Sequence, residues 1–324
     1  MLTTSIFNIS SPQAFETAAL DAFRYQYAHG TIYRKFCQLL KVDPNSVKRI
    51  TDIPFLPIEF FKSERIISSG RNSEITFTSS GTTSSITSKH HVASLDLYRQ
   101  SFRRGFHLYY GPPEDWTILA LLPSYLEREG SSLIYMVDTL IKDSGNTASG
   151  FYLNNLQDLI KTLEHLDKKG KPVLLLGVSY ALLDLVEART FNLKNTTIME
   201  TGGMKGRRKE MIRTELHTVL KKGFGVSEIH SEYGMTELLS QAYSKGNGIF
   251  ACPSWMQVLT RDTEDPFTYV EGKTGGINVI DLANWYSCSF IATQDLGKKH
   301  TDGNFEILGR FDTSDIRGCN LMVL

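Results

Sequence analysis

The residues best suited to chemistry begin with the stretch TFTSSGTTSSITSKHH, residues 76–91, which contains ten hydroxyl side chains and one glycine. A loop of serine, threonine and glycine after a strand offers backbone N–H groups and hydroxyl donors without bulk, as a polyphosphate requires. The stretch does not match the Walker pattern, because no second glycine followed by lysine comes after Gly81. It therefore predicts a phosphate cradle of another kind, with a solvated, flexible loop as the alternative.

A second stretch, SEYGMTEL at residues 231–238, places an aromatic ring, a glycine, a threonine and a carboxylate within five residues. Tyr233 is suited to stack on a base, Thr236 to bond a phosphate, and Glu237 to hold Mg²⁺ through oxygen. The alternative is an ordinary strand that turns into a helix. Taken with the hydroxyl-rich stretch, the pattern indicates a nucleotide site.

These two stretches, followed by QDLG (294–297) and GRFD (309–312), reproduce in order the core motifs of adenylate-forming enzymes, the superfamily of acyl-CoA synthetases and luciferases. Within that superfamily, the chain resembles the acyl-protein synthetases of bacterial bioluminescence at ETGGMKGRR (200–208), DLANWYSCSFIATQDLG (281–297) and SDIRGCNLM (314–322). The resemblance covers most of the chain from about residue 50. It implies ATP-dependent activation of a carboxylic acid of the fatty class to acyl-AMP. Transfer to a cysteine thiol and on to an acyl-CoA reductase-like protein partner would follow.

The resemblance also implies which residues bind ATP. The loop expected to wrap the β- and γ-phosphates consists of Thr78, Ser79, Ser80, Gly81, Thr82, Thr83 and Ser84. Adenine is expected beside Tyr233 and Gly234, in a slot lined by the backbone of Gly202 and Gly203. The alternative for the last two is a glycine turn at a helix N-terminus.

Four further residues complete the implied adenylation site. Asp295 would accept both ribose hydroxyls, as a carboxylate with several lone-pair sites can, and Arg310 would also reach the ribose. Each of these two has the alternative of an ordinary surface charge. Thr236 and Glu237 would stabilise the charge that develops on the phosphates, Glu237 through Mg²⁺.

The resemblance to typical acyl-CoA synthetases weakens at the C-terminal end. The sequence stops soon after GRFDTSD, where those enzymes continue into a small domain with a catalytic lysine, so that domain is expected to be essentially absent. The expected organisation is an adenylation (AMP-binding) domain at 1–308 and a short tail at 309–324. In the tail, Cys319 matches the acyl-accepting thiol, and Arg317 would lower its pKa. The alternatives are a structural cysteine and a ligase that acylates CoA, with an acyl or aryl acid, or a carrier protein.

Two other readings use different residues. LLLGVSYALL (174–183) imitates the nucleophile elbow of an α/β-hydrolase-type acyltransferase, with Ser179 as nucleophile and Asp281 or Asp295, then His300, completing the order. A scaffold subunit with an inactive nucleotide site is a non-enzymatic alternative. Of the adjacent histidines at positions 90 and 91, at most one is expected in the site, because neighbouring side chains point to different sides.

The elements that must position these residues follow from hydrophobic periodicity. A helix is expected at 12–42, with Ser10 or Ser11 as its cap, and a packed connector at 52–64. Further helices are expected at 94–110, 154–169, 179–190 and 205–223, and strands at 74–78, 115–123, 172–178, 195–200, 226–233, 276–282 and 305–310. The alternation predicts an α/β fold with mainly parallel sheets flanked by helices, and the many turn residues predict a β-rich subdomain after about residue 240.

Composition limits the possible partners and compartments. The 324 residues are 41% hydrophobic and 22% charged, with 35 basic and 35 acidic side chains, so no electrostatic footprint for nucleic acid is expected. No apolar run approaches the roughly 18–20 residues of a membrane span, and the N-terminus does not resemble a signal peptide. The cysteines lack any C-x-x-C pair, which favours a reducing cytoplasm over a zinc or disulfide scaffold.

Overall fold

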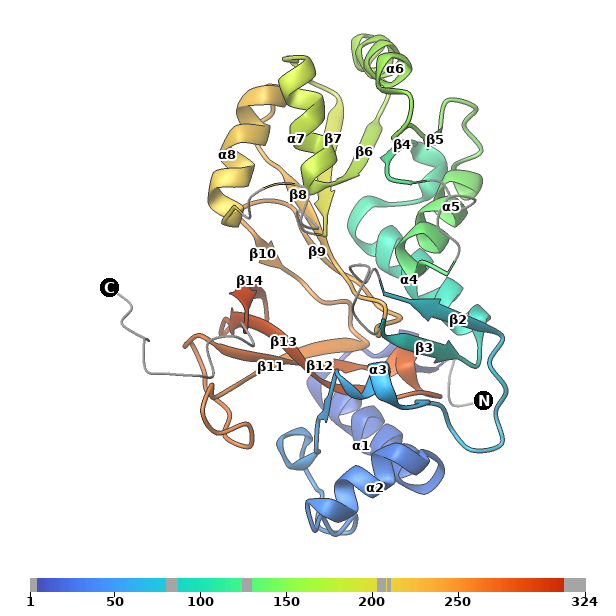
Figure 1. Cartoon of the computed structure of the whole chain (residues 1–324), viewed down its shortest axis with the longest axis vertical. Helices are drawn as coiled ribbons and strands as arrows, with labels where there is room; N and C mark the ends of the chain where they lie inside the picture. The colour runs from blue at the N-terminus through green and yellow to red at the C-terminus, as the bar shows by residue number, and fades with distance from the viewer. Residues whose placement is uncertain (1–4, 80–86, 124–129, 203–207, 209–210, 312–324) are drawn as a thin grey trace.

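Residues 5–79, 87–123, 130–202, 208 and 211–311 are described by a computed structural model. They form a parallel sheet covered by helices and a second, antiparallel sheet that lies beside the carboxyl ends of the parallel strands (Figure 1). A two-stranded hairpin and two N-terminal helices complete the described part.

The parallel sheet contains six strands in the order β5-β4-β6-β7-β8-β9, of which only β9 is antiparallel to its neighbour. Their bounds are β4 Thr117–Leu121, β5 Gly150–Phe151, β6 Val173–Val178, β7 Thr196–Thr201, β8 His230–Tyr233 and β9 Ala242–Ser244. Every residue of β4 and β6 is buried, because helices cover both faces of the sheet. The predicted parallel α/β sheet is therefore confirmed.

Five helices surround this sheet. They are α4 Leu95–Tyr110, α5 Ser132–Ser144, α6 Leu156–Lys168, α7 Ser179–Ala188 and α8 Arg213–Phe224. In Figure 1, α4 and α5 lie on one side of the sheet and α7 and α8 on the other. The start predicted for the last helix is wrong, because Ile212 has an extended backbone, with φ −67° and ψ 149°, directly before α8.

The antiparallel sheet follows residue 240, as predicted. Its main strands lie in the order β10-β14-β13-β12-β11, and a short β1 runs parallel to β13. The bounds are β1 Leu56–Pro57, β10 Ile249–Phe250, β11 Met256–Arg261, β12 Gly275–Asp281, β13 Phe290–Lys299 and β14 Phe305–Arg310. This sheet carries two of the expected site residues, Asp295 and Arg310.

The strand expected at 74–78 is present but does not belong to the parallel sheet. It is β2 (Ile75–Thr78), and it forms an antiparallel hairpin with β3 (Lys89–Val92). Thr78 is the cross-strand partner of Lys89, so the two ends of the hydroxyl-rich stretch lie side by side. A short helix, α3 (Phe60–Ser63), packs against β3.

The N-terminal helix predicted as one piece is two. Helices α1 (Pro12–His29) and α2 (Thr31–Leu39) are separated at Gly30, whose φ of −91° and ψ of 98° are not helical. Ser11 is the N-cap of α1, as expected, and its hydroxyl oxygen accepts from the amide of Ala14 at 3.1 Å. The side chain of the buried Gln26 bonds the backbone at Asn284 and other residues before β13, which attaches α1 to the antiparallel sheet.

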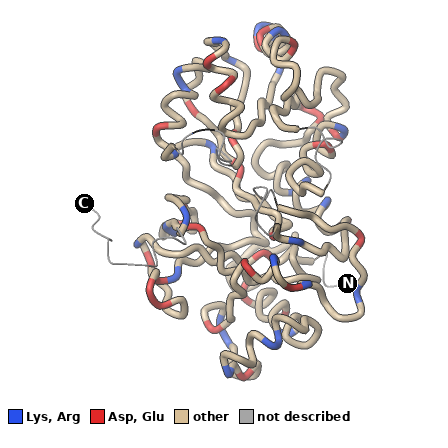
Figure 2. The backbone as a smooth tube through the Cα atoms, in the orientation of Figure 1, with Lys and Arg blue, Asp and Glu red and all other residues tan. Residues whose placement is uncertain are grey.

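Charges of both signs are interspersed along the chain (Figure 2). Among the described helices, none has both the length and the apolar character needed to cross a membrane.

Candidate active site

Three of the residues expected to hold the nucleoside meet where the two large sheets face each other. Tyr233 ends β8, whereas Asp295 and Arg310 are cross-strand partners on β13 and β14. The Tyr233 hydroxyl donates to Oδ2 of Asp295 at 2.8 Å, and Nε of Arg310 donates to Oδ1 at 3.0 Å. Folding thus joins side chains that are 62 positions apart in the sequence.

This trio combines a buried carboxylate with an accessible cation. The side chain of Asp295 is 8% exposed, and that of Arg310 is 72% exposed. Burial, together with the charge of Asp295, raises the pKa of Tyr233 well above its usual value, so its hydroxyl remains a donor. Each Asp295 oxygen retains a lone pair beyond the one already bonded. The arrangement is therefore chemically suited to two neighbouring hydroxyl groups beside an aromatic ring.

Glu237 lies in the loop that joins β8 to β9. Burial raises the pKa of its carboxyl, while a hydrogen bond with the Ser88 side chain and the charges of Arg310 and Lys62 oppose that shift. A buried carboxyl with a raised pKa is stabilised in its charged form by a cation, and its oxygens are ligands that Mg²⁺ prefers. No group of three or more His, Cys, Asp or Glu side chains in the described part of the chain could hold a metal alone. Glu237 therefore fits a Mg²⁺ ion that takes its other ligands from phosphate and water.

The loop that carries Thr236 and Glu237 is held on both sides by buried polar groups. Asn284 donates its side-chain amide to the Glu237 carbonyl at 2.7 Å, and His90 Nδ1 donates to the Thr236 carbonyl at 2.8 Å. Asp281 accepts from the backbone amides of Leu239 and Ser240 at 2.8 and 2.9 Å. These contacts fix the backbone around the two expected phosphate-side residues.

The hydroxyl-rich stretch is closed at its base. The Ser79 amide donates to the Ser88 carbonyl at 3.1 Å, and the Ser88 amide donates to Oγ of Ser79 at 2.9 Å. The Thr78 amide donates to the carbonyl of Gly130 at 2.8 Å. Because Ser88 also bonds Glu237, the base of the stretch adjoins the carboxyl expected to bind Mg²⁺. The other residues expected to bind the phosphates, Ser80, Gly81, Thr82, Thr83 and Ser84, lie outside the described residues.

The two histidines at the end of this stretch have different surroundings, as expected. His90 is fully buried, and its Nε2 lies 2.9 Å from Oγ of Ser287, while burial lowers its pKa to about 4. His91 Nδ1 instead lies 3.0 Å from Oγ1 of Thr76. The neutral His90 positions the backbone of Thr236 through the hydrogen bond to its carbonyl. Both ring nitrogens of His90 are engaged by protein groups, so neither faces a ligand.

The expected adenine slot is described only in part. Gly202 directly follows β7, has a left-handed backbone with φ of 67°, and accepts from the Ser179 hydroxyl at 2.7 Å. Gly203 lies outside the described residues. At Gly234, a Cβ atom would stand 2.4 Å from Oε1 of Glu232, so glycine leaves room for that buried carboxyl.

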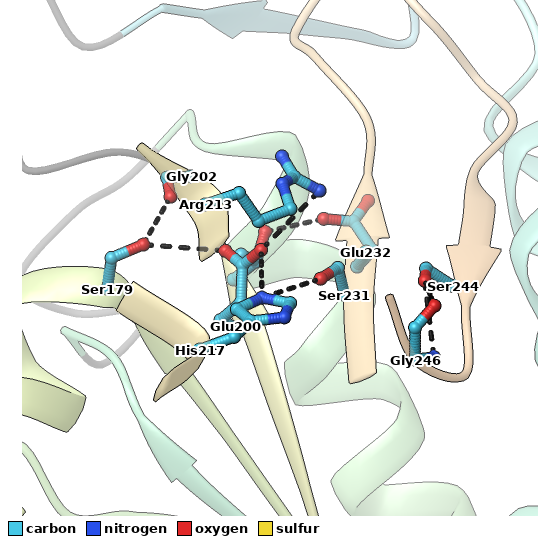
Figure 3. A network of polar contacts seen from close by, with 10 residues as sticks. Ser179, Glu200, Gly202, Arg213, His217, Ser231, Glu232, Ser244 and Gly246 are labelled. Carbon is cyan, nitrogen blue, oxygen red and sulfur yellow. Dashed lines mark hydrogen bonds and ion pairs between the residues drawn. The ribbon is translucent and has the colours of Figure 1, made fainter. Parts of the chain in front are cut away.

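Beneath this slot lies a buried polar network that the sequence did not reveal (Figure 3). Glu200 on β7 contacts Nε2 of His217 at 3.5 Å and Nη1 of Arg213 at 3.7 Å, both on α8. Next to it on β8, Glu232 accepts from the Thr201 hydroxyl at 2.5 Å. The available signal in the sequence was one glutamate near the end of β7, Glu200, and another just before Tyr233, Glu232. Only the parallel pairing of β7 and β8 makes these two glutamates neighbours.

The hydrolase arrangement is not assembled. The Ser179 hydroxyl donates to the carbonyl of Gly202 and lies 3.4 Å from Glu200, with no histidine among its described partners. His300 instead pairs with Glu306 at 3.5 Å. Within the described residues, Ser179 therefore supports the turn after β7 and has no histidine beside it to act as general base.

The described cysteines are poor thiolate candidates. Burial raises the pKa of Cys37, Cys252 and Cys288 to about 12 in each case. Cys319 lies outside the described residues. None of the three described thiols is therefore a ready nucleophile near neutral pH.

Comparison with solved structures shows the fold. The chain is similar to 2-hydroxyisobutyryl-CoA ligase in an open conformation in complex with 2-HIB-AMP and CoA, at 13% identity, with a TM-score of 0.69 over 93% of this chain and 70% of that chain. It is also similar to ATP-bound MatB from Rhodopseudomonas palustris, at 17% identity, with a TM-score of 0.53 over 72% of this chain and 47% of that one. Both matches show that the chain shares the fold of these two proteins.

Comparison with known sequences shows the family. A segment of 64 residues is 50% identical to the long-chain-fatty-acid–luciferin-component ligase of Photorhabdus luminescens, which is 19% of this chain and 54% of that protein. The match thus spans little more than half of that relative's length. The family described as acyl-protein synthetase, LuxE, matches residues 7–324. The chain belongs to the LuxE family of acyl-protein synthetases.

Proposed function

We propose that this protein is an ATP-dependent acyl-protein synthetase that activates a carboxylic acid of the fatty class and passes the acyl group to a thiol. The observation that carries the proposal is the cluster of Tyr233, Asp295 and Arg310, with Glu237 close by at the base of the hydroxyl-rich stretch. Family membership supports this reading, and so does the name of the Photorhabdus relative, which refers to a long-chain fatty acid.

In this proposal, both large sheets contribute to the nucleoside site, and the stretch after β2 and the loop after β8 contribute to the phosphate site. Asp295 accepts the two ribose hydroxyls, Arg310 supports the ribose, and adenine lies in the slot at Gly202 and Gly203 against Tyr233. The hydroxyl-rich stretch from Thr78 to Ser84 donates to the β- and γ-phosphates, and Thr236 donates on the same side. The ATP-bound state named for MatB supports ATP as the nucleotide.

The first chemical step is adenylation. A carboxylate oxygen of the acid attacks the α-phosphorus of ATP, the bond from that phosphorus to the bridging oxygen breaks, and pyrophosphate leaves with the electron pair. Mg²⁺, held by Glu237 and the phosphates, would neutralise the charge that develops on the leaving group. The protein's residues supply alignment and preorganised donors, which are the main catalytic contributions in such a reaction.

The second step is transfer to sulfur. A thiolate attacks the acyl carbon of acyl-AMP, AMP leaves, and a thioester forms, from which an acyl-CoA reductase-like partner would take the acyl group. We assign the thiol to Cys319, in a tail at 309–324 that follows an adenylation domain at 1–308. The high pKa values of Cys37, Cys252 and Cys288 support this choice, because only a thiolate is an effective nucleophile.

Exchange between labelled pyrophosphate and ATP tests the adenylation step. We expect acid-dependent exchange with fatty acids when aliphatic and aryl acids of several lengths are compared. Glu237→Gln should reduce the exchange at least tenfold, because it removes a charged Mg²⁺ ligand with little change of shape, whereas Glu215→Gln on the exposed face of α8 should not. Exchange that is absent with every acid, or unchanged in Glu237→Gln, contradicts the assignment.

Mass spectrometry tests the transfer step. Incubation with ATP, Mg²⁺ and the accepted acid should leave a hydroxylamine-labile acyl group on Cys319 without added CoA. Cys319→Ser should retain pyrophosphate exchange and lose this label, because a serine hydroxyl is far less ionised than a thiol near neutral pH. Direct acylation of added CoA or of a carrier protein, with an unmodified tail, would instead establish a ligase of that class.

A further inference from the structure

A cluster of buried polar side chains lies at the carboxyl end of β8, beside the expected adenine slot. Glu232 on β8 accepts from the Thr201 hydroxyl on β7, and its cross-strand partner on β9 is Tyr243. Gln241 directly precedes β9. We call these four side chains the polar cluster. The chemistry assigned so far uses none of them.

The polar cluster lies on the face of the parallel sheet that α4 covers. Directly opposite residues of an antiparallel pair project from the same face, about 5 Å apart at Cβ, so Glu232 and Tyr243 are neighbours. A Cβ atom added at Gly234 would contact both Oε1 of Glu232 and Cγ of Gln241, which places Gln241 on this face too. The Tyr243 ring lies 5.2 Å from the ring of Tyr109 on α4. The cluster is therefore enclosed between the sheet and α4.

Two atoms of the polar cluster are buried without a hydrogen-bond partner. They are Oε1 of Gln241 and the hydroxyl of Tyr243, neither of which bonds another group among the described residues. Gln241 is 6% exposed and Tyr243 is 3% exposed, so bulk water does not replace the missing partners. Folded proteins retain few such atoms, because each one loses its hydrogen bonds to water without compensation. The pair therefore indicates a ligand that supplies the missing bonds.

The polar cluster adjoins the place where the acid must be activated. Thr201 and Glu232 immediately precede Gly202 and Tyr233, the residues proposed to contact adenine. Successive side chains of a strand project to opposite faces, so the Tyr233 ring points away from α4, toward the antiparallel sheet. The nucleoside thus occupies one side of β8, and the acid that attacks the α-phosphorus approaches from the α4 side. The chain carbons next to its carboxyl then pass the polar cluster.

A hydroxyl group on the acid matches the two unpaired atoms. Side chains two positions apart on one face of a strand are separated by about 7 Å, so one hydroxyl between them can bond both. It would donate to Oε1 of Gln241 and accept from the Tyr243 hydroxyl, whereas a plain alkyl chain would leave both atoms unpaired. On the basis of the proposed function, we propose that Gln241 and Tyr243 select a fatty acid that carries a hydroxyl group near its carboxyl, on the second or third carbon.

Pyrophosphate exchange with acids of one chain length tests this selection. The panel contains the unsubstituted acid, its 2-hydroxy and 3-hydroxy forms, and the form with a hydroxyl at the far end. We expect the kcat/KM of the wild type for the 2- or 3-hydroxy acid to exceed that for the other acids by roughly 10- to 100-fold, as hydrogen bonds to otherwise unpaired buried groups imply.

Two variants test the residues that make the selection. Tyr243→Phe and Gln241→Met each remove one polar partner with little change of size, so each should lower kcat/KM for the hydroxy acid and maintain or raise it for the unsubstituted acid. Tyr33→Phe is the matched control, because its buried hydroxyl bonds the Pro54 carbonyl, and it should keep the wild-type preference.

Thermal unfolding without ligand tests the premise that the Tyr243 hydroxyl is unpaired. Tyr243→Phe should keep or raise the Tm, because it removes a buried polar group that has no partner to lose. Tyr33→Phe should lower the Tm, because it breaks a hydrogen bond of 2.7 Å. An equal decrease in both variants would show that the protein itself pairs the Tyr243 hydroxyl, and would overturn the inference.

The outcomes of the exchange assay separate this inference from the proposed function. A wild type that exchanges with all four acids at similar kcat/KM overturns the selection and leaves the proposed function intact. A preference that persists in both variants overturns the role of the two residues, and so does an equal loss for every acid, which would indicate a structural effect. A wild type that exchanges with no acid contradicts the proposed function, and this inference with it.

Discussion

Glu200 and Glu232 show how two neighbouring buried carboxyls acquire opposite protonation preferences. Burial raises the pKa of both. At Glu200, the hydrogen bond from His217 and the charge of Arg213 outweigh burial, so the pKa is lowered. Glu232 has only the Thr201 hydroxyl to oppose burial, and the charge of Glu200 adds to the upward shift, which brings its pKa to about 7. The difference lies in which side chains of α8 reach each carboxyl.

This pKa makes Glu232 a source of pH-dependent stability. Its pKa rises on folding from 4.5 to about 7, so the folded state binds the proton more tightly. The stabilisation is fully present below the pKa of the unfolded chain and is lost as pH rises through about 7. The difference between the two pKa values corresponds to about 3 kcal/mol.

Glu232→Gln should remove this dependence, since an amide is always neutral and its oxygen still accepts from Thr201. We therefore expect the stability of the variant relative to the wild type to increase between pH 5 and pH 8, by up to about 3 kcal/mol. Urea unfolding at several pH values measures this difference, and Glu215→Gln, which changes an exposed carboxyl, provides the reference. A difference that stays constant across this pH range would contradict the assigned protonation.

At the scale of elements, the sequence predicted those whose pattern is local. Strands β4 and β6 are almost wholly apolar runs, β7 (TTIMET) is rich in β-branched residues, and α4 and α6 have clear helical periodicity, so each was located within a few residues. The helix α5 and the strands β3 and β13 were missed. The polar KHHV of β3 becomes a strand only because β2 pairs with it, and that pairing is a tertiary contact.

The residues of the candidate site also fall into those that the sequence indicated and those that it did not. Motif order indicated Tyr233, Asp295 and Arg310, and the structure brings them into hydrogen-bond contact. The supporting groups, such as His217, Asp281 and Asn284, were not identified as supports, because their partners lie on other elements. Periodicity carries no information on which side chains meet across elements.

Asp281, at the end of β12, holds the loop between β8 and β9 in place by hydrogen bonds. It terminates β12, and its Oδ1 accepts from the Ala283 amide and the Ser240 hydroxyl, while Oδ2 accepts from the amides of Leu239 and Ser240. In Asp281→Asn, the side-chain NH2 group replaces one of the two accepting oxygens and therefore faces other hydrogen-bond donors. We expect a loss of about 2–3 kcal/mol in unfolding free energy.

Pyrophosphate exchange in the same variant should also fall, because the loop from 236 to 240 carries Thr236 and Glu237. Asp302→Asn is the matched control, since Asp302 caps an exposed turn through Asn304. Chemical denaturation and the exchange assay measure the two effects. If Asp281→Asn behaved like Asp302→Asn in both, the loop would not depend on this carboxylate.

At the scale of the whole molecule, the two sheets share one contact region around Tyr233. Its ring lies 5.9 Å from the Phe250 ring and 5.5 Å from the Phe305 ring, both of the antiparallel sheet, while its backbone belongs to the parallel sheet. A β-rich part after residue 240 was predicted. That it would lie beside the carboxyl ends of the parallel strands, where open α/β sheets bind ligands, follows only from the structure.

The hydrogen bond from Tyr233 to Asp295 is the polar part of this contact, and a double-mutant cycle measures it. Tyr233→Phe and Asp295→Asn each remove or weaken the bond, so their effects on unfolding free energy should be non-additive by about 1–3 kcal/mol. Tyr33→Phe is the control partner for Asp295→Asn, because the Tyr33 hydroxyl bonds the Pro54 carbonyl and shares no hydrogen bond with Asp295. That control pair should be additive.

Because ATP is proposed to contact both sheets, the Tm increase that ATP causes should also be smaller in Tyr233→Phe than in Tyr33→Phe. Additivity in both cycles, with equal ATP effects, would show that Tyr233 and Asp295 do not couple the sheets.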